Sequence, residues 1–154
     1  MSMRLLNVRA GECDDDLDSP HPCEIEAGRT YLYIATFLWN VVDPPRGREL
    51  RQFLDDVVTR PNDEGRIILT SAQMQGVLDR LAGLDQALWR VTDAHHRLRP
   101  DTVDRIRAEH PLVVDCKEES AGKTYTLENR YQDVWNVQTF LQRAIRLGRD
   151  VEID

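Results

Sequence analysis

The chain has 154 residues, a length that fits one domain and that can bury enough surface to fold without a metal or a disulfide. Hydrophobic residues make up 41% and charged residues 31% of the sequence, which is typical of a globular protein and excludes a disordered chain. Twenty Lys and Arg against 27 Asp and Glu give a net charge of −7. Because nucleic-acid binding needs a basic surface, we do not expect that class of function.

The N-terminal segment carries most of the excess negative charge. In the first 26 residues two arginines stand against seven acidic residues, a net charge of −5. Residues 3–9 could form an edge strand, and the turn-forming residues of 13–22 predict a loop without regular structure. We therefore expect an acidic strand-and-loop segment, residues 1–28, that packs on a helical core of residues 29–154 within a single domain.

Hydrophobic periodicity predicts that this core is mainly helical. Apolar residues recur at helical spacing in several segments, and proline or glycine residues follow the ends of these segments. Thr70 or Ser71 is placed to cap the longest helix, and Gly148 is placed to end the last one. The predicted helices span residues 29–43, 50–58, 72–98, 101–110 and 132–147.

Short strands complete the expected fold. Apolar and β-branched runs predict strands at residues 67–69, 112–115 and 123–127. The tail, residues 149–154, alternates polar and apolar residues like a terminal strand. The predicted fold class is α+β: a predominantly helical single domain of about five helices with a small antiparallel sheet of short strands.

The sequences around three tryptophans resemble one another. Trp39, Trp89 and Trp135 each follow Leu or Val and lie two residues before a Val. The similarity ends one helical turn away, whereas a true repeat would extend over a whole supersecondary unit. We therefore interpret the three tryptophans as core-facing residues and not as parts of a repeat.

The acidic loop is the strongest candidate for a binding site. Clustered negative charge accelerates association with a basic partner protein, although a solvated loop is the alternative interpretation. The spacing of three of its aspartates is typical of a calcium loop, but the required Gly and bidentate Glu are absent from the sixth and twelfth positions. We predict no metal here, and the predicted partner-binding residues are Asp14, Asp15, Asp16 and Asp18.

The cysteine and histidine residues predict no firm metal or catalytic site. Cys13, His21 and Cys23 could offer three zinc ligands from one loop, but the two cysteines lack the short spacing of zinc sites. Two semi-buried thiols and a loop histidine are the favoured interpretation, and metal binding by these residues stays open. Asp93 and His96 could form a general-base couple or a surface hydrogen bond. No nucleophile or phosphate-loop motif is present, so we predict no catalytic residue and no cofactor.

Hydropathy and cysteine content set the expected location. The longest apolar stretch, residues 31–42, is shorter than the about 20 residues that a membrane span needs. The first residues lack the apolar region of a signal peptide, and three cysteines are too few for a disulfide scaffold. We therefore expect a cytoplasmic protein with reduced cysteines that binds neither a membrane nor nucleic acid.

Three functions compete. In overall size and charge the chain is similar to bacterial toxin-neutralising proteins, although no residue motif assigns a family. The favoured hypothesis is a small acidic module that neutralises or regulates a basic partner protein, in the manner of an immunity protein or antitoxin. One alternative is a metal-assisted hydrolase built from dispersed Asp, Glu and His residues. Another is a self-associating structural component, with a homodimer face formed by spare tryptophans and the small-residue stripe Ala72, Gly76, Gly83 and Ala87.

Overall fold

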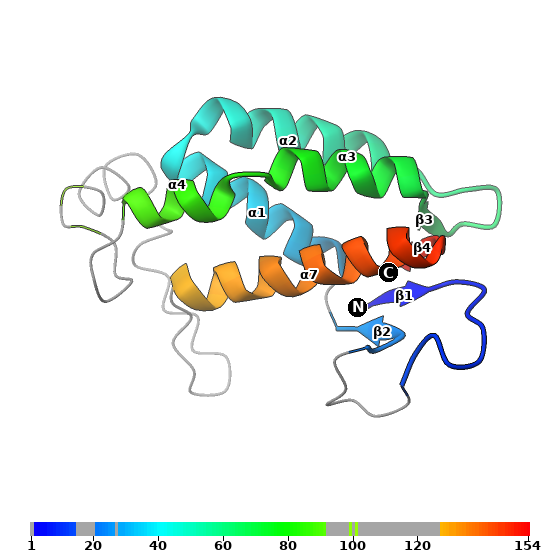
Figure 1. The fold of residues 1–154 in the computed structure, drawn as a ribbon. Coiled ribbons are helices and arrows are strands. Elements are labelled where there is room, and N and C mark those ends of the chain that lie inside the picture. The colour runs from blue at the N-terminus through cyan, green and yellow to red at the C-terminus, as the bar shows by residue number, and fades with distance from the viewer. Residues whose placement is uncertain (1, 15–20, 27, 92–98, 100, 102–126) are drawn as a thin grey trace, which may run out of the picture.

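The fold is a predominantly helical α+β domain, as predicted from the sequence, and its described residues form a four-stranded antiparallel sheet. Helices form most of the molecule, the sheet closes one end, and both chain termini lie at this end (Figure 1). The computed structural model describes residues 2–14, 21–26, 28–91, 99, 101 and 127–154.

The elements of the described residues follow one another along the chain. The helices are α1 (Gly28–Val42), α2 (Pro44–Val57), α3 (Ser71–Leu81), α4 (Leu84–Arg90) and α7 (Leu127–Leu147). The strands are β1 (Met3–Leu5), β2 (Glu24–Ile25), β3 (Ile67–Leu69) and β4 (Val151–Ile153).

Helices α1 and α2 are separated by a single residue, Asp43. Pro44 opens α2, because a proline lacks the N–H that the first turn of a helix leaves unpaired. The two helices approach closely at Gly47, where an added Cβ would lie 1.9 Å from Oδ1 of Asn40. A larger residue at position 47 would therefore require the Asn40 side chain to move.

The prediction of one continuous helix over residues 72–98 is wrong, because the described part of this range forms two helices, α3 and α4. The predicted cap at Thr70 is confirmed, since Thr70 and Gln73 form a capping box at the start of α3. Gly83 then adopts a φ of 84°, a left-handed conformation that glycine tolerates and that interrupts the helix before α4. Residues 92–98 lie outside the described residues.

Gly76, one residue of the small-residue stripe, lies at a close contact within the chain. An added Cβ at Gly76 would lie 2.4 Å from Cζ of Phe53 in α2. At Gly76 the stripe is therefore in contact with α2 of the same chain. Gly83 has a different role, since it separates α3 from α4.

The core lies between the helices and the inner face of the sheet. Trp39 is 1% exposed and donates its indole N–H to the Arg80 carbonyl at 2.9 Å, while the Arg46 guanidinium lies 4.0 Å from its ring centroid. Trp89 and Trp135, predicted to face the core, are 53% and 47% exposed, so that prediction is wrong for both. The other largest fully buried side chains are Met3, Leu32, Leu38, Leu50, Leu54, Leu69, Met74, Leu141, Val58, Val77 and Val137.

The strand order in the sheet is β2-β1-β4-β3. The strands predicted at residues 67–69 and 149–154 are confirmed as β3 and β4. The strand predicted within residues 3–9 is also present, but it is not an edge: β1 pairs with both β2 and β4. The edges are β2, which the sequence did not predict, and β3.

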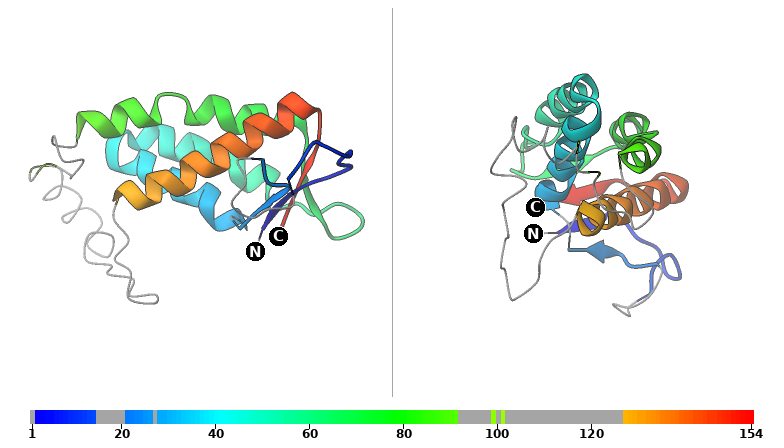
Figure 2. Two further views of the ribbon diagram at one scale, coloured as in Figure 1. Left: turned by 60° about the horizontal axis from the view of Figure 1, so that its bottom comes forward. Right: turned by 90° about the vertical axis from the view of Figure 1, so that its left-hand side faces the viewer.

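Helix α7 leads directly into the sheet, and β4 follows its end (Figure 2). Gly148 has a φ of 65° and donates its N–H to the Ile145 carbonyl, which confirms it as the C-terminal cap. The helix begins at Leu127, so the strand predicted over 123–127 is wrong at its last residue. The other residues of that strand, the strand at 112–115 and all but the first residue of the helix at 101–110 lie outside the described residues.

Candidate functional site

A disulfide closes the N-terminal acidic loop. Cys13 and Cys23 are bonded to each other, with their Cα atoms 5.3 Å apart. The expected pair of thiols is therefore wrong, and the two sulfurs are not thiolates available to a zinc ion. Inside the disulfide, Asp14 and Pro22 form an isolated bridge, and the Asp14 N–H donates to the His21 carbonyl at 3.0 Å.

The structure describes one of the four aspartates predicted to bind a partner. Asp14 is exposed beside the disulfide, whereas Asp15, Asp16 and Asp18 lie outside the described residues. In the sequence, these three aspartates lie between Asp14 and His21. A backbone hydrogen bond joins Asp14 to His21. The predicted acidic site is thus tied to the folded domain at both of its ends.

Glu12 anchors the base of this loop to the end of α7. Its carboxylate accepts hydrogen bonds from Nε and Nη2 of Arg149 at 3.0 and 2.8 Å. These bonds, together with one from the Arg9 backbone N–H, lower the pKa of Glu12 from 4.5 to about 2. The two-point geometry of a guanidinium and a carboxylate fixes the orientation of Glu12, the residue before Cys13, against Arg149.

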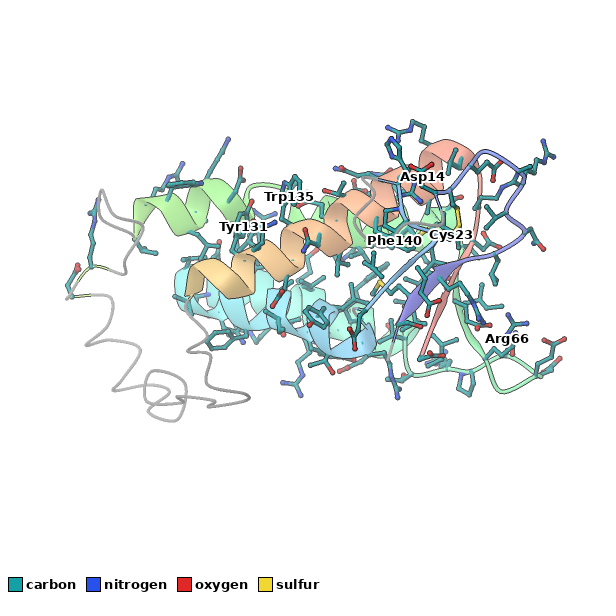
Figure 3. All side chains as sticks on the ribbon, turned by 90° about the horizontal axis from the view of Figure 1, so that it is seen from below. Asp14, Cys23, Arg66, Tyr131, Trp135 and Phe140 are labelled. Atoms are coloured by element: carbon teal, nitrogen blue, oxygen red, sulfur yellow. A yellow bond between two sulfur atoms is a disulfide. The ribbon has the colours of Figure 1, made fainter. Side chains whose placement is uncertain are left out.

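A groove of about 800 Å³ lies between β2 and α7, and is called the β2–α7 groove below. Ile25, Val137 and Phe140 give it an apolar floor, and His21 and Pro22 of the acidic loop border it. Figure 3 shows Phe140 on α7 close to Cys23, with Asp14 nearby. The C-terminal end of the acidic loop, His21 and Pro22, therefore borders this groove.

Arg143 is the buried charge of the groove. It is 7% exposed, its Nη2 donates to the Pro22 carbonyl, and its guanidinium lies 5.8 Å from the Phe140 ring centroid. Its Nε has no hydrogen-bond partner in the described part of the chain. Burial lowers the pKa of Arg143, the positive charge of Arg146 lowers it further, and Asp14 opposes both. A buried polar atom without a partner is rare in a folded protein. Arg80 Nε is a second one in the described residues, but of the two only Arg143 lines the groove.

Trp135 separates the β2–α7 groove from a second hollow. It lines both, and the second hollow has a volume of about 170 Å³ with Leu84 and Tyr131 in its wall. Burial, and to a smaller extent the nearby Asp85, raises the pKa of Tyr131. Figure 3 shows Tyr131, Trp135 and Phe140 in succession along α7.

The α7 side chains that adjoin Trp135 on the outer face of the helix are uncharged, and the nearest acidic residues, Asp133 and Asp85, line the two hollows beside it. Its neighbours on the outer face of α7 carry amide or hydroxyl groups in place of the charges common on helix surfaces. Depletion of charge around an exposed aromatic side chain is typical of the central part of a protein interface. These neighbours are Gln132, Asn136, Gln138, Thr139 and Gln142.

The sequence contained a signal for Trp135 that its interpretation as a core residue missed. The buried face of α7 is formed by Val134, Val137 and Leu141, at steps of three and four. Trp135 lies one residue beyond Val134, which places it about 100° around the helix from that face. A tryptophan at this position cannot share the apolar stripe of its own helix.

Other polar clusters in the described residues are paired within the fold. Tyr33 of α1 donates its hydroxyl to Asp55 of α2 at 2.6 Å, and burial together with this carboxylate raises the pKa of Tyr33 to about 12. Within the described ranges, no three His, Cys, Asp or Glu side chains gather as a metal site requires. Asp93 and His96, the possible general-base couple, lie outside these ranges.

Comparisons with protein-family models, with curated protein sequences and with solved structures give no match to this chain. The assignment of a function therefore depends on the geometry and chemistry of the site itself. As for membranes, none of the helices in the described ranges combines the length and the apolar character that a membrane span requires.

Proposed function

We propose that the protein is a small acidic protein-binding module that neutralises or regulates a basic partner protein. The observation that carries this proposal is Trp135, which is half-exposed on α7 and lines two hollows. Tryptophan is among the residue types most enriched in binding hot spots, because it buries a large rigid surface and retains a polar N–H. An exposed tryptophan beside a groove is therefore suited to hold a partner.

The negative charge of the acidic loop supports the proposal that the partner is basic. Its described aspartate, Asp14, lies next to His21 and Pro22 at the border of the groove. Negative charge at this position attracts a basic surface and raises the association rate, whereas buried contacts around Trp135 slow dissociation. The two parts of the site are thus expected to act on different rate constants.

The first experiment compares two exposed tryptophans. The partner is captured from the native cell with the tagged chain, identified by mass spectrometry and purified for binding measurements. We expect Trp135→Ala to raise the Kd by about 30-fold, the loss typical of a hot-spot residue. Trp89→Ala is the matched control, since Trp89 is 53% exposed but lines neither hollow, and should change the Kd less than about three-fold. Equal effects of the two substitutions would contradict the proposal.

The second experiment tests the acidic loop with charge-matched variants. Both variants lose four negative charges, so they differ only in where the charge is removed. We expect the loop variant to associate with the partner about ten-fold more slowly than the control variant at low salt. At high salt the two variants should associate at the same rate. The loop variant carries Asn at Asp14, Asp15, Asp16 and Asp18. The control variant carries the corresponding amide at Asp56, Asp63, Glu64 and Asp79, all exposed.

The location is part of the same proposal and is tested separately. The sequence predicts the cytoplasm, whereas a disulfide such as Cys13–Cys23 is typical of oxidising compartments. Alkylation of the intact native cell, followed by mass spectrometry, distinguishes the two. Alkylated Cys13 and Cys23 would support a reducing cytoplasm, and an intact disulfide would place the protein in an oxidising compartment.

A further inference from the structure

Strand β2 leaves backbone groups unpaired at the edge of the sheet. Arg4 of β1 pairs with Glu24, and the Leu5 N–H donates to the Cys23 carbonyl at 2.9 Å. Residues of an antiparallel ladder alternate between hydrogen-bonded and non-hydrogen-bonded pairs. Since Cys23 belongs to a hydrogen-bonded pair, Glu24 belongs to the other kind. Its N–H and C=O therefore point away from β1, towards an edge that no other strand of the described sheet occupies.

This open edge is a wall of the β2–α7 groove. Glu24, Ile25 and Glu26 line the groove from one side and α7 lines it from the other. On the α7 side the groove extends from Asp133 to Arg146, and the part up to Arg143 alone is about 15 Å long at the helical rise. An extended chain of about five residues covers that length.

The charges along the groove differ between its ends. The bond from Arg143 to Pro22 fixes one end, where Arg146 adds a second guanidinium. The carboxylates of Glu24 and Glu26 follow along the β2 wall, both exposed. A segment that fits the groove therefore carries a basic side chain opposite β2 and an acidic one near the arginines.

We propose that the β2–α7 groove binds an extended segment of the partner protein, which adds a fifth strand to the sheet at the edge of β2. The main chain of the segment exchanges hydrogen bonds with the N–H and C=O of Glu24, and its alternate apolar side chains pack against the half-buried Ile25. A helix could not use these backbone groups, because its own main chain is already hydrogen-bonded. The inference rests on the proposed function and specifies how the partner is held.

The probe is a linear dodecapeptide selected for binding from a random library displayed on phage. The selected peptide is synthesised unmodified and with N-methyl groups on either of its two alternating sets of backbone nitrogens. N-methylation removes hydrogen-bond donors and leaves every side chain in place. We expect methylation of the set that faces β2 to weaken binding at least about ten-fold, and methylation of the other set to weaken it less than about three-fold. The Glu24 amide should become protected from hydrogen exchange in the complex.

Two substitutions of one residue give a matched control. Glu24→Pro removes the outward N–H without removing a bond to β1, and edge strands tolerate proline at such a position. Glu24→Gln removes the charge alone. We expect Glu24→Pro to weaken peptide binding at least about ten-fold and Glu24→Gln about three-fold or less. If Glu24→Pro fails to fold, as judged by circular dichroism, the N-methylated peptides still test on the unmodified chain whether the segment adds a strand.

The inference is overturned if the library yields no binder, if neither methylated peptide is weakened, or if the Glu24 amide stays unprotected. These failures differ from failure of the proposed function. A natural partner that depends on Trp135 but leaves the Glu24 amide exchanging freely would retain the protein-binding function and remove the added strand. A natural partner insensitive to Trp135→Ala would contradict the proposed function itself.

Discussion

Two buried charges of opposite sign mark two different regions of the molecule. Glu152 in β4 and Arg143 in α7 are each 7% exposed. Glu152 accepts hydrogen bonds from Arg4 on one side and Arg66 on the other, so each of its carboxylate oxygens is paired. Arg143 donates a hydrogen bond from Nη2 to the backbone carbonyl of Pro22, and its Nε has no partner in the described residues.

The difference separates a structural region from a binding region. Around Glu152 the chain supplies all the partners that the charge needs, and these contacts link the strands of the sheet. Around Arg143 the chain supplies only some of them, and the residue lines a groove. Figure 3 shows Arg66 at the end of the molecule that holds the sheet, and Trp135 on α7, away from that end. Glu152 and Arg143 are equally buried, so they differ in pairing and in position: of the two, only Arg143 is incompletely paired and lines a groove.

The largest expected effect comes from removing the paired charge. Glu152→Ala should lower the free energy of unfolding by about 2–3 kcal/mol, because hydrogen bonds between charged groups are lost at a buried position. Glu64→Ala is the control: Glu64 also contacts Arg66, at 3.4 Å, but its side chain is 71% exposed. We expect the control to change stability by less than about 0.5 kcal/mol in urea unfolding. Similar losses in both variants would show that the buried pairing has no special role.

Removing the incompletely paired charge should have a smaller effect on stability. Arg143→Met keeps the volume and removes the charge, and we expect the free energy of unfolding to change by no more than about 1 kcal/mol. Binding of the selected peptide should weaken in the same variant, since an acidic side chain loses its counter-charge. If Arg143→Met instead destabilises the fold as strongly as Glu152→Ala and leaves binding unchanged, the comparison between the two regions fails.

Local patterns in the sequence predicted the elements that depend on local interactions. The helix at 29–43, the cap at Thr70, the strand at 67–69 and the cap at Gly148 all follow from the spacing of neighbouring residues. The break at Gly83 was missed because apolar periodicity continues across it. A positive φ at one residue changes the direction of a helix without changing the pattern of its side chains.

The candidate site was only partly predictable, for a different reason. The acidic loop is a run of charge that can be read directly, and Asp14 is exposed as expected. The groove depends on β2, a two-residue strand formed by pairing with β1, and such pairing leaves no periodic signal in so short a segment. The disulfide also depends on tertiary proximity, because the ten-residue separation of Cys13 and Cys23 does not itself specify a bond.

The smallest expected effect concerns the attachment of the acidic loop to α7. The pKa of Glu12 is about 2 in the folded protein and 4.5 ordinarily, so its pairing with Arg149 contributes stability above about pH 4.5 and loses it as the pH falls towards 2. Glu12→Gln removes this titration. Hydrogen exchange of the Asp14 amide, measured between pH 6 and pH 2, should show stronger protection in the unmodified chain at the upper end and equal protection at the lower end. Parallel protection curves for the two chains would show that the Glu12–Arg149 pair does not hold the loop at the groove.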